Sequence, residues 1–441
     1  MFSPSFKPVF AKRLTTWLLG LSAGVVAAAC LVACGGGGTS TASNGSGIGS
    51  GGTGSFTTGS ISGFGSIIVN GIRYDNTGVA AASQDDDAAP ELKLGMVVEV
   101  EGGSTADVST STGTQTVAKA SSIKVGFELL GPVTLGSVNT TDGTFRSLGQ
   151  TIYVTVDTFF DQDNGLSGIG DAQTCPYVRV YGFPRTQGGY SASRVECQSN
   201  QPTYYRVRGP VTQVSGSTVY INDGGPSQLS GGQYVLAPGV AAPSVGQIVR
   251  AVLSVSGQSW TIVNFKGEAR SLSQTREARV EGVVSDYSAA TGTLHVNGVP
   301  VKISNTTTLQ PSGLALTANN LRVEVRGQLV NGVLNATLIE QESEQYTYSG
   351  GGGSPGSPPS GGGLREIELH GSVDTLSTSS QSFSTRGVKV YYLTSGTNKT
   401  RFPSGKSASD LSNGLAVEIK GVRSSSGGAA IVATEIKFSN D

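Results

Sequence analysis

The sequence has little of the chemistry that most enzymes and nucleic-acid-binding proteins use. Only 14% of its 441 residues are charged, the formal net charge is −1, and there are two histidines and four cysteines. A near-neutral chain without a basic stripe lacks the electrostatic footprint of a nucleic-acid-binding protein. Its cysteines and histidines form no cluster with metal-ligand spacing. We therefore expect no nucleic-acid partner, no metal and no cofactor.

Catalytic motifs are also missing from the sequence. His295 and His370 lie at non-equivalent positions of predicted strands, which favours surface or rim positions for both. Gly-x-Ser-x-Gly occurs at 20–24 and 352–356, but neither copy lies in the strand–turn–helix that a nucleophile elbow requires. We predict that the chain is not an enzyme. A catalytic site would have to be assembled between its domains.

One acidic segment has enough oxygen ligands to suggest calcium. It lies between Asp157 and Asp171, around Gly165. Calcium sites place several oxygens on a tight loop, and the EF-hand loop closes with a glutamate. This segment has neither the EF-hand spacing nor the closing glutamate, so we interpret it as a solvated loop.

The N-terminal residues carry a targeting signal. Lys7, Lys12 and Arg13 precede an apolar run, Trp17–Val32. The run leads into the motif Leu31-Val32-Ala33-Cys34, which resembles the lipobox of bacterial lipoproteins. The position of this motif, directly after the apolar run, is the position that a lipoprotein signal peptide requires.

The lipobox resemblance implies a lipid anchor. Residues 1–33 would be removed as a signal peptide, and Cys34 would carry a diacylglyceryl group on its sulfur and a fatty acid such as palmitate on its amine. An uncleaved membrane span is the alternative, because the apolar run is near the lower length limit for one. The glycine run after Cys34 favours the lipid. The residue after Cys34 is Gly35 rather than aspartate, which is compatible with transport to the outer membrane of the cell envelope. The sequence does not determine which face of that membrane the protein occupies.

The rest of the chain reads as repeated short strands. Glycine is abundant, at 64 residues, and Val, Ile, Thr and Tyr dominate the ordered stretches. A hairpin with an Asn-Gly turn is clearest at Asn297-Gly298. A strand that ends in glycine precedes each hairpin, at Gly59, Gly131, Gly209, Gly282 and Gly371. A second strand that ends in glycine closes four of the repeats, at Gly102, Gly182, Gly327 and Gly421. The third repeat has only a degenerate form of this strand.

These repeats predict an all-β protein, a tandem array of about five small five-stranded OB-like barrels behind the signal peptide. An open sandwich would give nearly the same pattern. Two glycine-rich segments are flexible tethers, and the second isolates the fifth repeat. The predicted boundaries are 34–55 for the first tether, 56–127, 128–205, 206–272 and 273–345 for the first four repeats, 346–363 for the second tether and 364–441 for the fifth repeat.

The repeats resemble a family found in bacterial envelope lipoproteins, the domain of unknown function 5666 family. The resemblance rests on Gly59–Gly71, which reads Gly-Ser-Ile-Ser-Gly-Phe-Gly-Ser-Ile-Ile-Val-Asn-Gly, and on Leu94–Gly102. It is best at 59–102, fair at 279–339 and 364–437, and weaker between them. The family implies tandem OB-like barrels and an envelope location. It implies no activity.

Cys175 and Cys197 are an even pair in a chain that we expect to be exported. Two predicted strands, 177–183 and 190–196, flank a turn at Thr186–Gly189. Folding this hairpin about its midpoint sets Cys175 opposite Cys197, and cross-strand neighbours are close enough for a bridge. We predict a disulfide between them.

The second repeat also supplies a candidate ligand patch. Alternation places Arg179 and Tyr181 on the outer face of its fourth strand. Other repeats carry outward glutamates there, Glu99, Glu324 and Glu418, which favour solubility or pairing with a neighbouring repeat. A ring beside a guanidinium can stack on a sugar or anchor a protein partner. The alternative is that a neighbouring repeat covers both side chains.

These features predict a lipid-anchored protein of the cell envelope with a non-enzymatic binding or structural role. Its partners would be the membrane, through the N-terminal lipid, and an envelope protein or a glycan. Two alternatives stay open. One is a surface glycan-binding or adhesion lipoprotein, and the other is an envelope enzyme with a site between repeats.

Replacing Cys34 with serine should leave the chain unlipidated and uncleaved, because the thioether to the lipid requires sulfur. Mass spectrometry of the N-terminal peptide measures both changes. Cys30→Ser is the matched control and should be processed normally, since Ala27-Ala28-Ala29 before it lacks a large aliphatic residue. A wild-type mature chain that starts elsewhere, or that has an unmodified Cys34, would contradict the prediction.

Overall fold

Alternation of apolar and polar residues along short glycine-bounded segments produces strands throughout the chain. This computed structural model describes residues 54–438, apart from 86–87, 111–112, 225–231, 257–258, 267–273, 343–365 and 425–429. The predicted signal peptide, the lipobox with Cys34 and the second tether lie outside the described residues. Within the described residues, no helix is long and apolar enough to span a membrane.

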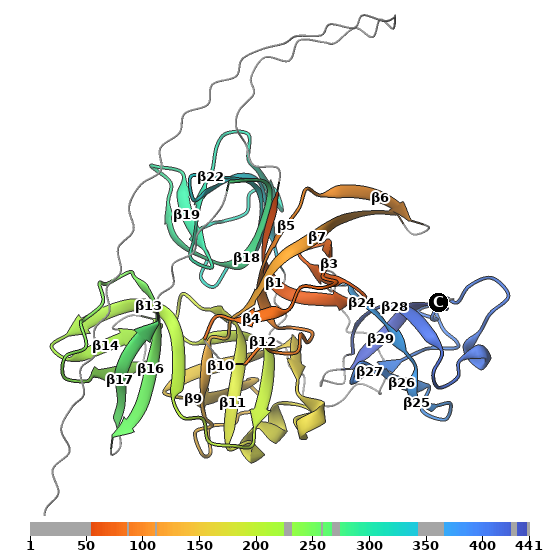
Figure 1. Ribbon diagram of the computed structural model, residues 1–441, viewed down its shortest axis with the longest axis horizontal. Helices are drawn as coiled ribbons and strands as arrows, with labels where there is room; N and C mark the ends of the chain where they lie inside the picture. Colours follow the sequence, from red (N-terminus) through yellow and green to blue (C-terminus); the bar gives the residue numbers. More distant parts are fainter. Residues whose placement is uncertain are drawn as a thin grey trace, which may run out of the picture. The chain divides into compact units, whose positions relative to one another are not determined.

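The strands follow one another in five sets, which Figure 1 separates by colour. The first repeat has β1 (Ser55–Phe64), β2 (Ile67–Val69), β3 (Ile72–Asp75), β4 (Ala81–Ser83), β5 (Val97–Gly102), β6 (Ala106–Thr110) and β7 (Gly113–Val125). The second has β8 (Leu129–Pro132), β9 (Thr144–Ser147), β10 (Gln150–Phe160), the short 3-10 helices η1 (Gln162–Asn164) and η2 (Ile169–Thr174), β11 (Tyr177–Pro184) and β12 (Tyr190–Gln198).

The remaining three repeats contain strands and one more short helix. The third has β13 (Tyr205–Ser215), β14 (Thr218–Ile221), β15 (Gln233–Leu236), β16 (Ile248–Ser256) and β17 (Ser259–Lys266). The fourth has β18 (Thr275–Ser288), β19 (Thr293–Val296), β20 (Val299–Lys302), β21 (Thr308–Gln310), β22 (Arg322–Val330) and β23 (Val333–Gln341). The fifth has β24 (Ile367–Ser372), β25 (Asp374–Ser377), β26 (Ser382–Thr385), β27 (Val388–Tyr391), η3 (Ala408–Asp410), β28 (Ala416–Arg423) and β29 (Ile431–Phe438).

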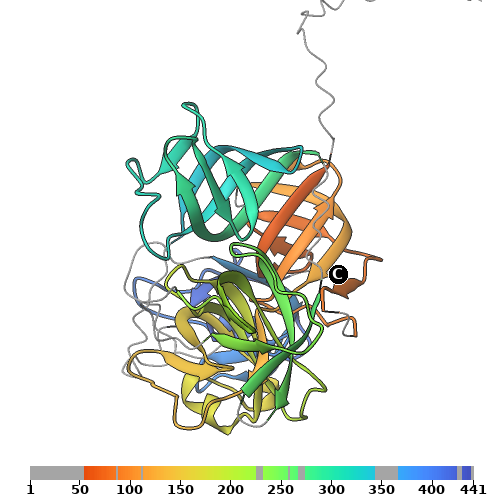
Figure 2. The same cartoon turned by 90° about the vertical axis from the view of Figure 1, so that its left-hand side faces the viewer.

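Each repeat closes into a five-stranded barrel. In the fourth repeat, which is teal in Figure 2, β18 pairs antiparallel with β19 and β22, and β19 pairs with β20. β22 pairs with β23, and a short parallel pairing of β20 with β23 closes the ring. The same ring, including the parallel closure, is present in the other four repeats. The prediction of tandem OB-like barrels is confirmed, and the open sandwich is wrong.

The recurring glycine of the first strand makes room for the hairpin turn. Asn297, at φ 47°, turns the β19–β20 hairpin down onto Gly282. A Cβ at Gly282 would lie 2.7 Å from the Cβ of Asn297, closer than real Cβ atoms approach. The equivalent glycine lies against the left-handed turn residue in every repeat, in the pairs Gly59 and Asn70, Gly131 and Leu148, Gly209 and Asn222, and Gly371 and Arg386.

The second recurring glycine marks a β-bulge. The register of β22 against β23 shifts between Arg326 and Gly327, so that Thr337 has no partner across the ladder. A Cβ at Gly327 would lie 2.0 Å from the carbonyl oxygen of Asn335. The Thr337 hydroxyl donates to the Arg326 carbonyl at 3.1 Å. The bulge bends the strand where the barrel must curve.

All five repeats have this bulge, including the third, whose sequence signature is degenerate. There the register shifts between Val252 and Leu253, so a leucine stands where the other repeats have glycine. The three other bulges lie at Glu101/Gly102, Tyr181/Gly182 and Lys420/Gly421. The second recurring glycine therefore reflects the curvature of the barrel and not ligand binding.

The first strands of different repeats lie beside one another. β1 pairs in parallel with β18 through Ser55–Thr58 and with β24 through Gly63–Phe64, while β8 pairs antiparallel with β13. Figure 1 shows β1 next to both β5 and β18. The apolar side chains of the first and fifth repeats form one buried cluster, as do those of the second and third. The prediction that the second tether isolates the fifth repeat is therefore wrong.

The two cysteines are joined as predicted, but they do not lie opposite each other in the hairpin as the sequence analysis expected. Cys175 and Cys197 form a disulfide with their Cα atoms 5.5 Å apart. β11 and β12 pair antiparallel, and Val178 lies opposite Cys197. Cys175 is buried in the core of the second and third repeats. The predicted disulfide is confirmed.

Replacing Gly282 or Gly327 with alanine should destabilise the chain by about 1–3 kcal/mol, because each new Cβ overlaps a turn residue or a backbone oxygen. Chemical unfolding followed by circular dichroism measures the loss. Gly170→Ala is the matched control, since a Cβ there would meet nothing within 4 Å. Equal unfolding midpoints for the three variants would contradict this account of the signatures.

Candidate functional site

The Arg179–Tyr181 patch is not exposed. Val178 and Val180 point into the core of their own barrel, so the predicted alternation holds. Tyr181, however, is only 1% exposed and belongs to the buried cluster of the first repeat. The Tyr181 ring packs edge-on against the Phe127 ring, and the Arg179 guanidinium lies 4.9 Å from the centre of the Phe127 ring. The predicted ligand patch is wrong, because the first repeat covers it.

Polar contacts add to this interface between the first two repeats, which we call the seam. The Tyr181 hydroxyl donates to Glu196 at 3.4 Å, and Arg194 donates to the same carboxylate at 2.7 Å. Arg194 also donates to the Leu94 carbonyl, and Ser193 donates to the Gly95 carbonyl. Burial, followed by the charge of Glu196, raises the pKa of Tyr181, so the phenol keeps its proton.

Buried ion pairs join the other repeats. Arg208 of the third repeat donates to Glu128 of the second at 3.0 Å, and both side chains are buried. The same guanidinium lies 3.4 Å from Asn297 Oδ1 in the fourth repeat. Arg208 therefore contacts three barrels at once.

The first and fourth repeats have a comparable junction. Glu281, which is fully buried, accepts from the Ser60 backbone N–H at 3.0 Å and is bound by Arg322. Glu281 and Arg322 both belong to the fourth repeat, so the Ser60 N–H is the group that reaches this carboxylate from the first repeat. Because burying a charge without a partner is costly, the Arg208–Glu128 pair restricts which surfaces of the second and third repeats can meet.

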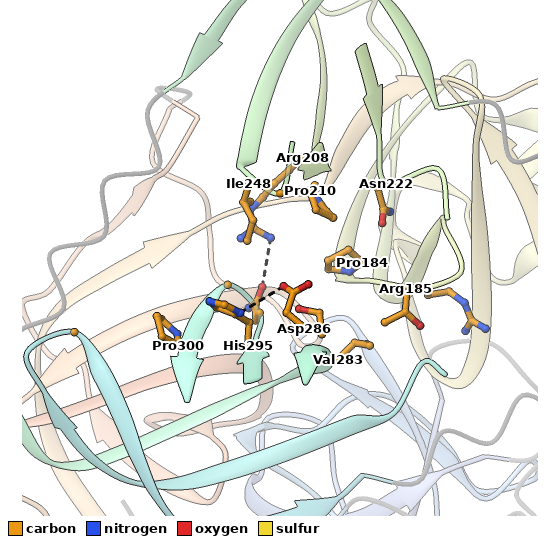
Figure 3. A pocket seen from close by; sticks show the side chains of 17 residues that line it. Pro184, Arg185, Arg208, Pro210, Asn222, Ile248, Val283, Asp286, His295 and Pro300 are labelled. Atoms are coloured by element: carbon orange, nitrogen blue, oxygen red, sulfur yellow. Dashed lines mark hydrogen bonds and ion pairs between the residues drawn. The ribbon is translucent and has the colours of Figure 1, made fainter. Parts of the chain in front are cut away.

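A cavity of about 740 Å³ lies where the second, third and fourth repeats meet. Arg208 and Ile248 lie on one side of it, and Asp286 and His295 reach into it from the other (Figure 3). The wall consists of Pro184, Arg185, Thr186, Arg208, Gly209, Pro210, Asn222, Gly246, Ile248, Val283, Ser285, Asp286, His295, Asn297, Gly298, Pro300 and Gly332. Cavities of this size between domains are common ligand sites.

Asp286 and His295 are the titratable pair of the cavity. Asp286 Oδ2 lies 3.4 Å from His295 Nδ1. Asp286 has φ 51° and lies in an irregular stretch of the β18–β19 ladder between Ser285 and Ser288. Left-handed conformations of residues other than glycine cost free energy and are often found at functional sites. The irregular ladder brings this carboxylate beside His295 at the cavity.

Comparisons with known proteins identify the repeats. Segments 131–196, 281–340 and 370–437 match the family described as Domain of unknown function (DUF5666). These three segments are similar to that family. They fall within the second, fourth and fifth repeats, so the resemblance seen in the sequence is confirmed. The expectation that 59–102 matches best is wrong, because that segment is not among those matched.

Other comparisons add little to the DUF5666 identification. No curated protein matches the chain. One similar solved structure is a multidomain protein with nucleic acid binding domains from Streptococcus pneumoniae TIGR4. It is 12% identical, and the match covers 52% of this chain and 72% of that chain with a TM-score of 0.12. A similarity at this level carries no argument about fold or function.

The fifth repeat brings together Glu368, His370 and Glu418, whose ligand atoms lie within 4.8 Å of one another. The guanidinium of Arg73 already lies among them. It pairs with Glu368 and lies 3.2 Å from His370 Nε2. Burial, followed by the charge of Arg73, lowers the pKa of His370. This cluster joins two repeats and is not the candidate ligand site.

Asp161, from the acidic segment of the second repeat, is also paired. It is buried, accepts from the Asn164 side chain at 2.6 Å, and lies 3.6 Å from both Lys93 and Arg194. The prediction of a solvated loop is therefore wrong for Asp161, whose carboxylate faces two cations of the seam.

Replacing Tyr181 with alanine should destabilise the chain by about 3–5 kcal/mol, because a buried ring is lost from the seam. Tyr181→Phe should cost only about 0.5–1.5 kcal/mol, since it removes one hydrogen bond. Chemical unfolding measures both, with the exposed Tyr204→Ala as control. Wild-type stability of Tyr181→Ala would show that the seam does not form.

Proposed function

We propose that this chain is a lipid-anchored, non-enzymatic binding protein of the cell envelope, whose ligand occupies the cavity between the second, third and fourth repeats. The cavity is the observation that carries the proposal. It is large enough for a drug-sized molecule, and polar groups from separate barrels converge on it. The lipobox at Cys34 supports the anchor and the envelope location, with the outer membrane as the expected one.

The walls of the cavity are held in place before a ligand arrives. Arg208 is fixed by Glu128, and it contacts Asn297 across the junction. Asn222 donates from its side chain to the Gly189 carbonyl at 2.7 Å. A site whose side chains are already ordered loses less entropy when a ligand binds. These contacts favour a binding role for the junction over a purely structural one.

The hydroxyls of the cavity wall support binding over catalysis. Among the described residues, neither Ser285 nor Thr186 donates to His295, and Thr186 bonds Asn320 instead, at 3.1 Å. A serine or threonine nucleophile needs a base within hydrogen-bond reach. The Asp286–His295 pair therefore suits recognition of a polar ligand. An enzyme with its site between repeats remains the competing proposal.

Photo-crosslinking in living cells tests this proposal. A photoreactive amino acid at Ser285 or Pro300 should capture a ligand from the envelope, because both positions line the cavity. The matched control is the same amino acid at Asp374, which is exposed on the fifth repeat. Adducts that appear at Ser285 and Pro300 but not at Asp374 would support the proposal. Equal labelling at all three positions would contradict it, and recovery of a chemically cleaved ligand would favour the enzyme.

A further inference from the structure

We propose that the cavity takes a neutral oligosaccharide, an inference that rests on its being a ligand site as proposed above. One wall would pack against the C–H faces of the sugar rings. Asp286 and His295 would bind the hydroxyls. Three properties of the cavity support this ligand class: arginines that already bind other protein groups, an apolar wall and the type of its hydrogen-bonding groups.

The two arginines at the cavity are already bound by other groups of the protein. The Arg208 guanidinium lies 3.0 and 3.2 Å from the two carboxylate oxygens of Glu128. Arg185 stacks on the Tyr153 ring at 4.0 Å and donates to the Ser191 hydroxyl. Figure 3 shows its guanidinium directed away from the cavity centre. A phosphate or carboxylate ligand would need a cation directed at it, whereas a neutral ligand does not.

The apolar wall comes from three repeats. Pro184, Pro210 and Pro300 line the cavity together with Ile248 and Val283. Figure 3 places Pro210 and Ile248 across from His295 and Asp286, with Pro184 to the side. Proline has no backbone N–H, so such a wall offers C–H surface without a donor to satisfy. The C–H faces of pyranose rings are the part of a sugar that packs on surfaces of this kind.

The polar side has the groups that vicinal hydroxyls require. An ionised carboxylate accepts only, through two oxygens, whereas a neutral imidazole donates from one nitrogen and accepts at the other. The Asp286 and His295 side chains are 76% and 44% exposed, but His295 Nδ1 is buried beside Asp286. The groups that can reach a ligand are therefore the Asp286 carboxylate and the other ring nitrogen of His295. Hydrogen bonds to a charged acceptor are stronger than neutral ones. The pair can therefore bind neighbouring hydroxyls that each donate and accept.

Binding of the purified full chain to an array of neutral and acidic oligosaccharides tests the inference, with calorimetry on the best neutral probe. Asp286→Asn and His295→Ala should each weaken binding at least about tenfold, because each removes a polar partner of the ligand. Asparagine tolerates the left-handed backbone at position 286, so Asp286→Asn should fold normally. Asp374→Asn, at an exposed site on the fifth repeat, is the matched control and should bind like the wild type.

Failure of this inference is separable from failure of the proposed function. If no neutral oligosaccharide binds, or if Asp286→Asn and His295→Ala bind as well as Asp374→Asn, the saccharide assignment is wrong. Crosslinking at Pro300 to a protein or to an acidic ligand would then leave the cavity as a binding site and overturn only the ligand class. Loss of both the array signal and the specific crosslink would overturn both proposals.

Discussion

The contact between a first-strand glycine and a left-handed turn residue is the constraint on which the rest of this structure depends. In each barrel the hairpin folds down onto the first strand, and a side chain at the glycine would prevent it. The residue just before the glycine then extends from the outer face of the barrel. In the third and fourth repeats that residue is Arg208 or Glu281, and both are buried in junctions with other repeats. One local constraint thus sets both the barrel and its points of contact.

Much of the fold could be predicted because its causes are local. The recurring glycines, the Asn297-Gly298 turn and the positions of Cys175 and Cys197 each depend on residues close together along one strand or hairpin. The functional surface could not be predicted in this way. Alternation correctly pointed Tyr181 away from its own barrel, but alternation does not say which neighbour covers an outer face. The cavity is invisible in the sequence for the same reason, since its walls come from three barrels.

Junctions made of buried ion pairs give specificity more than stability. The attraction between Arg208 and Glu128 is offset by the cost of removing both charges from water. Removing one partner would leave an unpaired buried charge and cost about 3–5 kcal/mol. Misaligned barrels would leave the same unpaired charges, so these pairs select one arrangement of the repeats. The cavity requires that arrangement, because Arg208 lies in its wall and bonds to two of the three barrels around it.

The central claim is that the third and fourth repeats are held in one arrangement, so that the cavity exists in solution. The distance distribution between spin labels at Ser217→Cys and Asn305→Cys tests it most directly, because both residues are exposed and each lies on one of these barrels. The account predicts a single narrow distribution in the wild-type background that broadens when Arg208 is replaced with leucine. A broad distribution in the wild-type background, unchanged by that replacement, would contradict it.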